Sequence, residues 1–178
     1  MTLSLTVPDI LVARAKAGDL EALEGLYRAF ETPVYNLARR ICRAPEDAED
    51  VVQETFLEVV RSIAHYRGEG HLWGWIRQIA ASKAFMRLRR DKIRATDELV
   101  DDAAGSPPAS IGARIDLERA FERLSETSRA VVWLHDVEGF THEEIAEQMG
   151  RTVSFSKSQL ARAHARLRRL LEVEPEAR

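Results

Sequence analysis

The chain has 178 residues, 45% of them hydrophobic and 31% charged, a balance that is typical of a soluble globular protein with one or two small domains. A single cysteine and the lack of any apolar stretch of about 20 residues exclude a disulfide framework, a cysteine-based zinc site and direct insertion into a membrane. The sequence begins without a basic segment followed by an apolar one, so we expect no secretory signal and a cytoplasmic protein.

The net charge of −3 conceals a strong segregation of charge along the chain. Residues 44–60 hold six acids and no base, residues 71–94 hold seven bases and one acid, and residues 151–170 hold six bases and no acid. Local patches of charge set the field that a polyanion meets. The two basic segments therefore predict two nucleic-acid contacts, and the acidic segment predicts a different partner. Any one of these runs, taken alone, is better explained as a solvated helix face.

The first half of the chain predicts four helices, over about 8–17, 19–42, 45–63 and 72–91. Pro33 lies inside the second helix and is predicted to break or kink it, because proline lacks a backbone N–H. In the third helix, apolar residues recur with helical period on one side, and acidic and polar residues occupy the other.

An acidic tract rich in helix-breaking residues follows, and it predicts a linker over 95–112 between a first domain, 1–94, and a second domain, 113–178. The second domain predicts four helices, over about 115–124, 128–137, 142–149 and 153–171. The predicted fold class is all-α, with two small helical domains joined by a flexible linker.

The end of the chain has the pattern of a helix-turn-helix. Thr141 and Glu144 form a capping box at the start of a short helix, in which each side chain can bond the backbone of the other residue. Gly150 makes the turn, and Thr152 or Ser154 caps a longer basic helix. The first residues of such a helix can reach base edges in the major groove of DNA.

Three arginines point away from the apolar stripe of this last helix, at Arg162, Arg166 and Arg169. On a DNA-binding helix they would contact phosphates and anchor the duplex. The alternative is a plain helical hairpin whose solvent-exposed face is basic. We favour the DNA-binding interpretation.

No catalytic, metal or cofactor site is predicted. His142 and Glu143 begin like the zinc-protease helix motif, but its second histidine would have to stand at Ala146. His135 and Asp136 are neighbours in sequence and so point to different faces of a helix. We therefore predict that the protein is not an enzyme.

Three segments, 47–57, 70–80 and 137–150, resemble regions two and four of bacterial extracytoplasmic-function (ECF) sigma factors, the smallest group of the sigma-70 family. The first motif is highly specific, and the order and spacing of the third after it are diagnostic. The resemblance covers roughly residues 9–171 apart from the linker. It implies a subunit that binds core RNA polymerase and directs promoter recognition, DNA melting and transcription initiation. It also implies control by an anti-sigma factor, although the sequence itself does not show that partner.

The resemblance also assigns residues by position. Region two of such proteins is a helical bundle that binds the clamp helices of the largest polymerase subunit and opens the minus-ten promoter element. The residues implied to bind core polymerase are Asp47, Asp50, Gln53, Glu54 and Leu57. Those implied to bind minus-ten DNA are Tyr66, His71, Trp73, Arg77, Ser82, Lys83, Arg87, Arg89 and Arg90. Region four reads the minus-thirty-five element with its last helix, here through Thr141, Thr152, Ser154, Phe155, Lys157, Ser158, Gln159, Arg162 and Arg166.

Melting a duplex requires compensation for lost base stacking, which aromatic side chains can supply. Tyr66, Trp73 and Trp75 are the candidates. The alternative for each is packing in the core, which we favour for Trp75 and leave open for Trp73.

The sequence departs from the family pattern in two helices. Ser82 and Met86 stand where the family usually has Asn and Asp, close to minus-ten DNA. Lys83 and Arg87 lie nearly in line with the apolar stripe of their helix, so its last turns are predicted to leave the core.

In the last helix, Ser156 occupies a position that is normally apolar, and Phe155 projects toward the arginine side. Phe155 can meet a thymine methyl group or a sugar at the edge of the groove, with Gln159 reading an adenine or touching phosphate. Equally, Phe155 can fold back against the preceding helix.

Two other functions remain open from the sequence. One is an autonomous helix-turn-helix regulator, which would bind its duplex without polymerase. The other is an interaction protein that keeps the fold and sequesters a partner, an idea prompted by the departures at Ser82, Met86 and 154–159.

Overall fold

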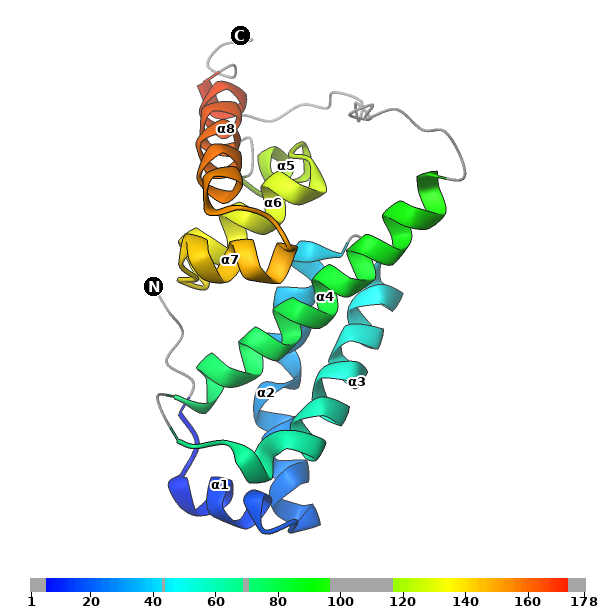
Figure 1. Ribbon diagram of the computed structural model, residues 1–178, viewed down its shortest axis with the longest axis vertical. Helices are drawn as coiled ribbons and strands as arrows, with labels where there is room; N and C mark the ends of the chain where they lie inside the picture. The colour runs from blue at the N-terminus through cyan, green and yellow to red at the C-terminus, as the bar shows by residue number, and fades with distance from the viewer. Residues whose placement is uncertain (1–5, 43, 69–70, 97–116, 173–178) are drawn as a thin grey trace, which may run out of the picture. The chain divides into compact units, whose positions relative to one another are not determined.

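The computed structural model describes residues 6–42, 44–68, 71–96 and 117–172, and the elements in these ranges are helices (Figure 1). The chain divides into two compact units near residue 92. The predicted all-α class with two helical units is confirmed. The predicted linker lies outside the described residues except for its first two positions, which belong to a helix. No helix in the part of the chain that the structure describes is long and apolar enough to cross a membrane.

The first unit consists of α1 (Asp9–Lys16), α2 (Leu20–Ile41), α3 (Pro45–Ser62), the short 3₁₀ helix η1 (Ile63–His65) and α4 (Leu72–Thr96) (Figure 1). The helices begin where local chemistry favours a start. The side chain of the residue before α2 accepts hydrogen bonds from two backbone N–H groups of its first turn. A proline opens α3, where its missing N–H costs no intrahelical bond.

The second helix runs without a break through Pro33, so of the two predicted effects, a break or a kink, the break does not occur. Phe30, Val34 and Leu37 flank this proline and are fully buried. An interior proline costs a helix roughly 3 kcal/mol, and burial of three large apolar side chains offsets a cost of this size. Tertiary packing therefore overrides the local preference.

The last turns of α4 were predicted to leave the core, and up to residue 88 they do not. Ala84, Phe85 and Leu88 are buried. Lys83 and Arg87 share that stretch of helix but are only half buried, because they reach sideways to carboxylates of α3. The helix therefore stays packed while its basic side chains turn toward a neighbouring helix.

The second unit consists of α5 (Leu117–Glu122), α6 (Glu126–Val132), its π-helical continuation η2 (Trp133–Val137), α7 (His142–Met149) and α8 (Val153–Glu172) (Figure 1). Helices α6 and α7 both pack against α8. Of the apolar stripe predicted to face inward on α8, Leu160, Ala163 and Leu167 are buried. Its last two members do not follow, since Leu170 is half buried and Leu171 is exposed.

The predicted helix-turn-helix is present in this unit. Thr141 Oγ1 accepts from the Glu144 backbone N–H at 3.2 Å, and Glu144 Oε2 accepts from the Thr141 N–H at 2.8 Å, which completes the capping box. Gly150 ends α7 with φ of 61°, a left-handed conformation that glycine adopts without strain. Thr152 Oγ1 accepts from the Phe155 N–H at 3.1 Å, so Thr152 is the residue that caps α8.

Candidate partner and nucleic-acid interfaces

The five residues predicted to bind polymerase lie along α3, and the structure separates them into two kinds. Gln53 and Leu57 are exposed to solvent, Leu57 with 57% of its surface. Asp47, Asp50 and Glu54 instead form ion pairs with bases of α4. Of these five residues, the amide and the leucine therefore face solvent, while the three carboxylates pair with bases of α4.

These pairs form a ladder between α3 and α4, which we call the α3–α4 ion-pair ladder. Arg87 is its centre, with one guanidinium nitrogen 2.6 Å from Asp47 Oδ1 and another 2.7 Å from Asp50 Oδ2. The outer rungs are Lys83–Glu58 at 3.4 Å and Arg90–Glu54 at 3.9 Å.

The ladder changes the electrostatics of its central arginine. Burial alone would lower the pKa of Arg87, but the hydrogen bonds and charges of Asp47 and Asp50 outweigh it and raise that pKa. Three bases predicted to hold minus-ten DNA are thus engaged by carboxylates, and a phosphate would have to replace those carboxylates to bind them. Sequence reasoning missed these pairs, which join residues far apart in the chain, 37 positions for Arg87 and Asp50 and 25 for Lys83 and Glu58.

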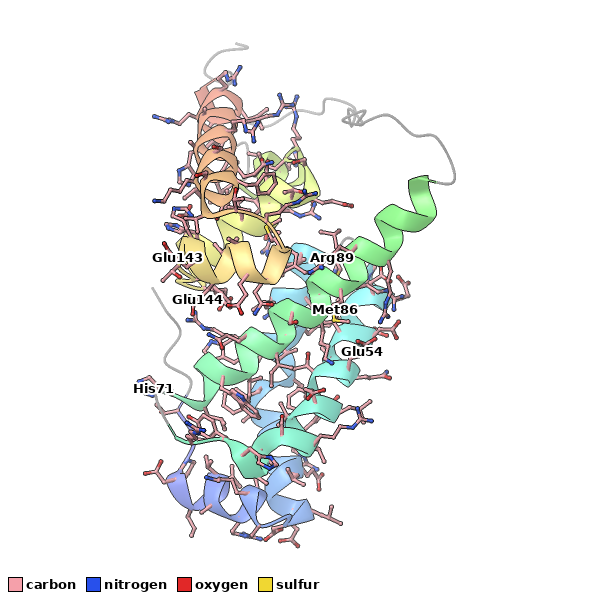
Figure 2. The ribbon with its side chains drawn as sticks, in the orientation of Figure 1. Glu54, His71, Met86, Arg89, Glu143 and Glu144 are labelled. Carbon is pink, nitrogen blue, oxygen red and sulfur yellow. The ribbon has the colours of Figure 1, made fainter. Side chains whose placement is uncertain are left out.

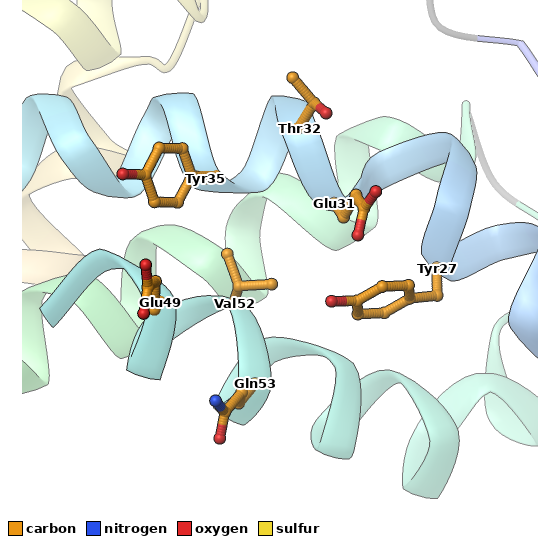
Figure 3. Close-up of a pocket in the computed structure, with 7 residues that line it drawn as sticks. All are labelled: Tyr27, Glu31, Thr32, Tyr35, Glu49, Val52 and Gln53. Atoms are coloured by element: carbon orange, nitrogen blue, oxygen red, sulfur yellow. The ribbon is translucent and has the colours of Figure 1, made fainter. Parts of the chain in front are cut away.

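A groove of about 390 Å³ lies between α2 and α3, beside the exposed side of α3 (Figure 3). Its lining combines aromatic, acidic and polar side chains: Tyr27, Glu31, Thr32, Tyr35, Glu49, Val52 and Gln53. The ring of Tyr27 packs on Phe56 with centroids 4.7 Å apart. Burial raises the pKa of the Tyr27 hydroxyl, and its hydrogen bond with Glu31 raises it further.

Gln53 belongs both to this groove and to the predicted polymerase-binding set. The α2 side of the groove was not predicted from the sequence. The signal was available, because Tyr27, Glu31 and Tyr35 recur every four residues and so share one helix face.

Trp73 is not available to stack on DNA bases in this structure, which corrects its assignment as a minus-ten contact. Only 4% of its surface is exposed, and its ring stacks on Phe30 with centroids 5.9 Å and planes 6° apart. The physical reason is the helical period, since Trp73 shares the inward face of α4 with Ile76 and Ala80.

Trp75, for which we favoured the core, is the more exposed of the two tryptophans. It is half buried, and its ring lies 5.2 Å from that of the half-buried Tyr66 at an angle of 33°. The aromatic pair that remains partly open to solvent is therefore Tyr66 and Trp75, and not Trp73.

The outer face of α4 carries two of the other predicted minus-ten residues, Ser82 and Arg89. Ser82, Met86 and Arg89 are spaced four and three residues apart, so they share one helix face, and Met86 and Arg89 are exposed (Figure 2). His71 is exposed just before the first turn of the helix, and Arg77 is half buried. The two departures from the family pattern in this helix thus lie on the face directed to solvent.

Most residues predicted to read minus-thirty-five DNA are exposed on α8 or at the turns before it. The exposed ones are Thr141, Thr152, Ser154, Lys157, Ser158, Arg162 and Arg166. Gln159 is half buried, and its side-chain oxygen accepts a hydrogen bond from the Ser128 hydroxyl of α6 at 3.3 Å. Reading a base with Gln159 would require this bond to break.

Phe155 lies at the start of α8 with its ring half buried. The guanidinium carbon of Arg151, in the turn before the helix, lies 5.5 Å from the ring centroid. This distance is within the range of a cation–π interaction. One side of the ring is thus covered by a cation that is itself exposed.

A polar cluster explains how α8 tolerates Ser156 at an apolar position. Ser156 is fully buried, and its hydroxyl oxygen lies 3.0 Å from Nδ1 of His142. The ring of His142 stacks on that of His135, with centroids 4.5 Å apart. Asp136 accepts from His135 at 2.9 Å and from His164 of α8 at 2.6 Å. The prediction that the neighbours His135 and Asp136 point to different helix faces is wrong for their side chains, which meet within the π-helical turn η2.

The cluster is not a metal site by its geometry. Among residues 6–42, 44–68, 71–96 and 117–172, no group of three or more His, Cys, Asp or Glu side chains is placed to hold a metal ion. Its contacts join η2 and α7 to α8.

We expect acidification to destabilise the second unit through His142. Burial, followed by the nearby charges of His135 and Lys157, lowers the pKa of His142. The unfolded chain therefore binds more protons than the fold near the ordinary histidine pKa of about 6.5, and stability is lost as the pH falls through that value. His142→Gln, which keeps a polar partner for Ser156, is expected to flatten this dependence. Thermal unfolding followed by circular dichroism from about pH 8 to pH 5 measures it.

Asp136 serves as the internal comparison for this experiment. Burial alone would raise the pKa of Asp136, but the hydrogen bonds from His135 and His164 outweigh it and lower that pKa. Its stabilising contribution is therefore lost only below the ordinary carboxyl range, at pH below about 4. An unchanged slope between pH 8 and pH 5 in His142→Gln would show that another group carries the effect.

Comparisons with known proteins agree with the division of the chain into two units. Residues 26–93 match the family Sigma-70 region 2, and residues 114–167 match Sigma-70, region 4. The ECF RNA polymerase sigma factor SigM of Mycobacterium tuberculosis is 33% identical over 162 residues, which cover 90% of this chain and 83% of that protein. The ECF RNA polymerase sigma-E factor of Haemophilus influenzae is 30% identical over 169 residues, 86% of this chain and 89% of that protein.

Two solved structures share the fold, each with a TM-score of 0.58. One is CnrH, solved in complex with the cytosolic domain of CnrY, with 21% identity and alignment over 93% of this chain and 97% of the other. The second is the sigma factor RpoE from Bartonella quintana, solved with the anti-sigma factor NepR, with 24% identity and alignment over 85% and 98%.

The three sequence motifs, the helix-turn-helix and the two family matches in this order lead to one assignment. The chain belongs to the sigma-70 family of RNA polymerase sigma factors, in its extracytoplasmic-function group.

Proposed function

We propose that this sigma factor docks on core RNA polymerase through the exposed side of α3 and the adjoining groove. The observation that carries the proposal is Leu57, an apolar side chain with 57% of its surface exposed at the end of the most specific motif. Val60 is exposed one turn later, and the groove beside them offers Glu31 and Glu49. An apolar centre with acidic neighbours suits an amphipathic helix that carries basic residues.

Minus-ten DNA is proposed to bind the outer face of α4 and the Tyr66–Trp75 pair. Arg89 and Met86 are exposed on this face, and the aromatic pair is partly open to solvent. Bases released from the duplex can stack on aromatic rings while a basic helix attracts the backbone. The ladder bases Lys83, Arg87 and Arg90 join this surface when a phosphate takes the place of a carboxylate.

Minus-thirty-five DNA is proposed to bind the first turns of α8. Thr152, Ser154, Lys157 and Ser158 are exposed there. Two exposed arginines further along the helix, at positions 162 and 166, are placed to contact phosphates. In this proposal the arginines orient the duplex through its phosphates, and the residues at the start of α8 read the bases.

An anti-sigma factor is proposed as the controlling partner, in the cytoplasm. Support comes from the likeness in fold to RpoE of Bartonella quintana, which was solved with the anti-sigma factor NepR. The groove between α2 and α3 and the exposed Leu57 suit such a partner as well as polymerase, so the two would compete.

Reconstitution with core polymerase tests the proposed function against its alternatives. Initiation from defined start sites that needs both the protein and core polymerase is the expected result. Specific duplex binding at the same affinity with and without polymerase would instead support an autonomous regulator. Tight polymerase binding without initiation from any promoter of a genomic library would support a sequestering protein.

Phe155→Ala is expected to lower the affinity of the holoenzyme for its promoter by about five- to 150-fold, because a base contact contributes roughly 1–3 kcal/mol. If Phe155 meets a thymine methyl group, the loss will be largest on the wild-type sequence and small on a duplex with that base pair changed. Affinities for a set of singly substituted duplexes measure this. A uniform loss on every duplex would contradict the readout role, and Phe155→Leu controls for packing.

A further inference from the structure

The N-terminal helix α1 is attached to the segment that leads into α4. The Lys16 ammonium donates a hydrogen bond to the main-chain carbonyl oxygen of Tyr66 at 2.7 Å, across 50 positions of sequence. Helix α1 also packs against η1, which ends at the residue before Tyr66. The match to Sigma-70 region 2 begins at residue 26, so α1 lies outside it.

Tyr66 is held from two sides. Its main-chain N–H donates to the Ile63 carbonyl at 3.0 Å, and its carbonyl accepts from Lys16. Its ring lies against that of Trp75, and burial raises the pKa of its hydroxyl. The position of the aromatic pair therefore depends on the last turn of α1 as well as on α4.

The end of α1 is itself fixed in place. Arg14 donates to Asp19 at 2.6 Å and reaches Glu21 at 3.2 Å, which ties α1 to the start of α2. Gly18 makes the turn between the two helices with φ of 83°. Lys16 is exposed, yet its ammonium group donates to a neutral carbonyl. As a cation in the last turn of α1, Lys16 also interacts favourably with the negative end of the helix dipole.

We propose that Lys16 is a positioning residue for promoter melting. By holding the Tyr66 carbonyl it places the Tyr66–Trp75 pair where an unpaired base can stack, and it does so without touching DNA. The inference rests on the proposed role of this pair in binding minus-ten DNA. It assigns to α1 a part in melting that is separate from polymerase binding.

The test compares Lys16→Met with Arg28→Met in the full-length protein bound to core polymerase. Methionine is an unbranched side chain without the donor. The exposed Arg28 pairs with Glu24 of its own helix α2, so its loss leaves the contacts that fix the end of α1 in place. The probe is the duplex promoter fragment from which the wild-type holoenzyme initiates most strongly. Opening is measured by permanganate reactivity of minus-ten thymines.

Lys16→Met is expected to open this promoter about three- to tenfold less than the wild type, the size expected for losing one charge-assisted hydrogen bond. Its affinity for core polymerase should be unchanged, and Arg28→Met should open the promoter like the wild type. Lys16→Arg should restore opening, because arginine keeps a cationic donor.

A second measurement separates positioning from general structure. On a template whose minus-ten strand is already unpaired, Lys16→Met should still bind more weakly, because the stacking pair is displaced. Trp75→Ala should then add no further loss in the Lys16→Met background, since both changes disable the same pair. Circular dichroism checks that each variant is folded.

Three results would overturn the inference: normal opening by Lys16→Met, an equal loss in Arg28→Met, or full additivity with Trp75→Ala. All three are compared with a wild-type holoenzyme that initiates in the same assay. If the wild type fails to initiate with core polymerase from any promoter, the proposed function fails and not only the role of Lys16.

Discussion

Trp73→Ala lowers the free energy of unfolding of the first unit by about 3–5 kcal/mol, the cost of deleting a large buried aromatic side chain. This is the largest stability effect that we expect in the protein. The ring of Trp73 is 4% exposed and stacks on Phe30, so its removal leaves a cavity and exposes the facing ring. Urea unfolding of the full chain followed by circular dichroism measures the change.

Trp75→Ala is the matched control, two positions away on the same helix. Because Trp75 is half buried beside Tyr66, we expect a loss of stability of less than about 1.5 kcal/mol. Its larger effect should be on DNA, where one base stacked on an aromatic ring contributes about 1–3 kcal/mol. Equal destabilisation by the two substitutions would show that the tryptophans do not differ as their burial indicates.

Leu57→Arg weakens binding to core polymerase by about thirtyfold or more, which corresponds to roughly 2 kcal/mol for a residue at the centre of an interface. The fold should be unaffected, since Leu57 is exposed and the substitution fills no space in the core. Leu20→Arg makes the same change at an exposed leucine of α2 outside the predicted set, and it should bind polymerase like the wild type.

Charge reversal on α3 is a less direct probe of the same surface. Asp50→Arg would place a second guanidinium beside Arg87 and break a pair that is 2.7 Å long, so it disturbs the fold and the interface together. The exchange Asp50→Arg with Arg87→Asp restores the pair in reverse. If the exchanged protein is stable but does not bind polymerase, the sign of the charge at position 50 matters for docking.

Retained binding in Leu57→Arg would contradict the first of these two predictions and would place the polymerase site elsewhere.

The sequence was sufficient wherever structure depends on residues close together in the chain. The capping box at Thr141 and Glu144, the turn at Gly150 and the proline that opens α3 each act within one helical turn. The residue types and their spacing are therefore enough to predict where these helices begin and end. For the same reason, the helices of both units were placed to within a few residues.

The sequence was insufficient wherever the orientation of one helix toward another decides a residue's environment. Helical period groups Trp73 with Ile76, but which face turns inward depends on α2, whose Phe30 lies more than 40 residues earlier. The bond between His142 and the buried Ser156 likewise needs the crossing of α7 and α8. Such contacts are set by packing geometry, which no short pattern contains.

The α3–α4 ion-pair ladder has a consequence for how this protein can be re-engineered. Asp47, Asp50 and Glu54 belong to the segment assigned to polymerase, while their partners on α4 belong to the segment assigned to promoter DNA. A chimera that imports α4 from a relative, to obtain a new promoter preference, must therefore import a compatible α3 as well. Exchanging the two helices as one cassette would preserve the charge matching that a single-helix graft destroys.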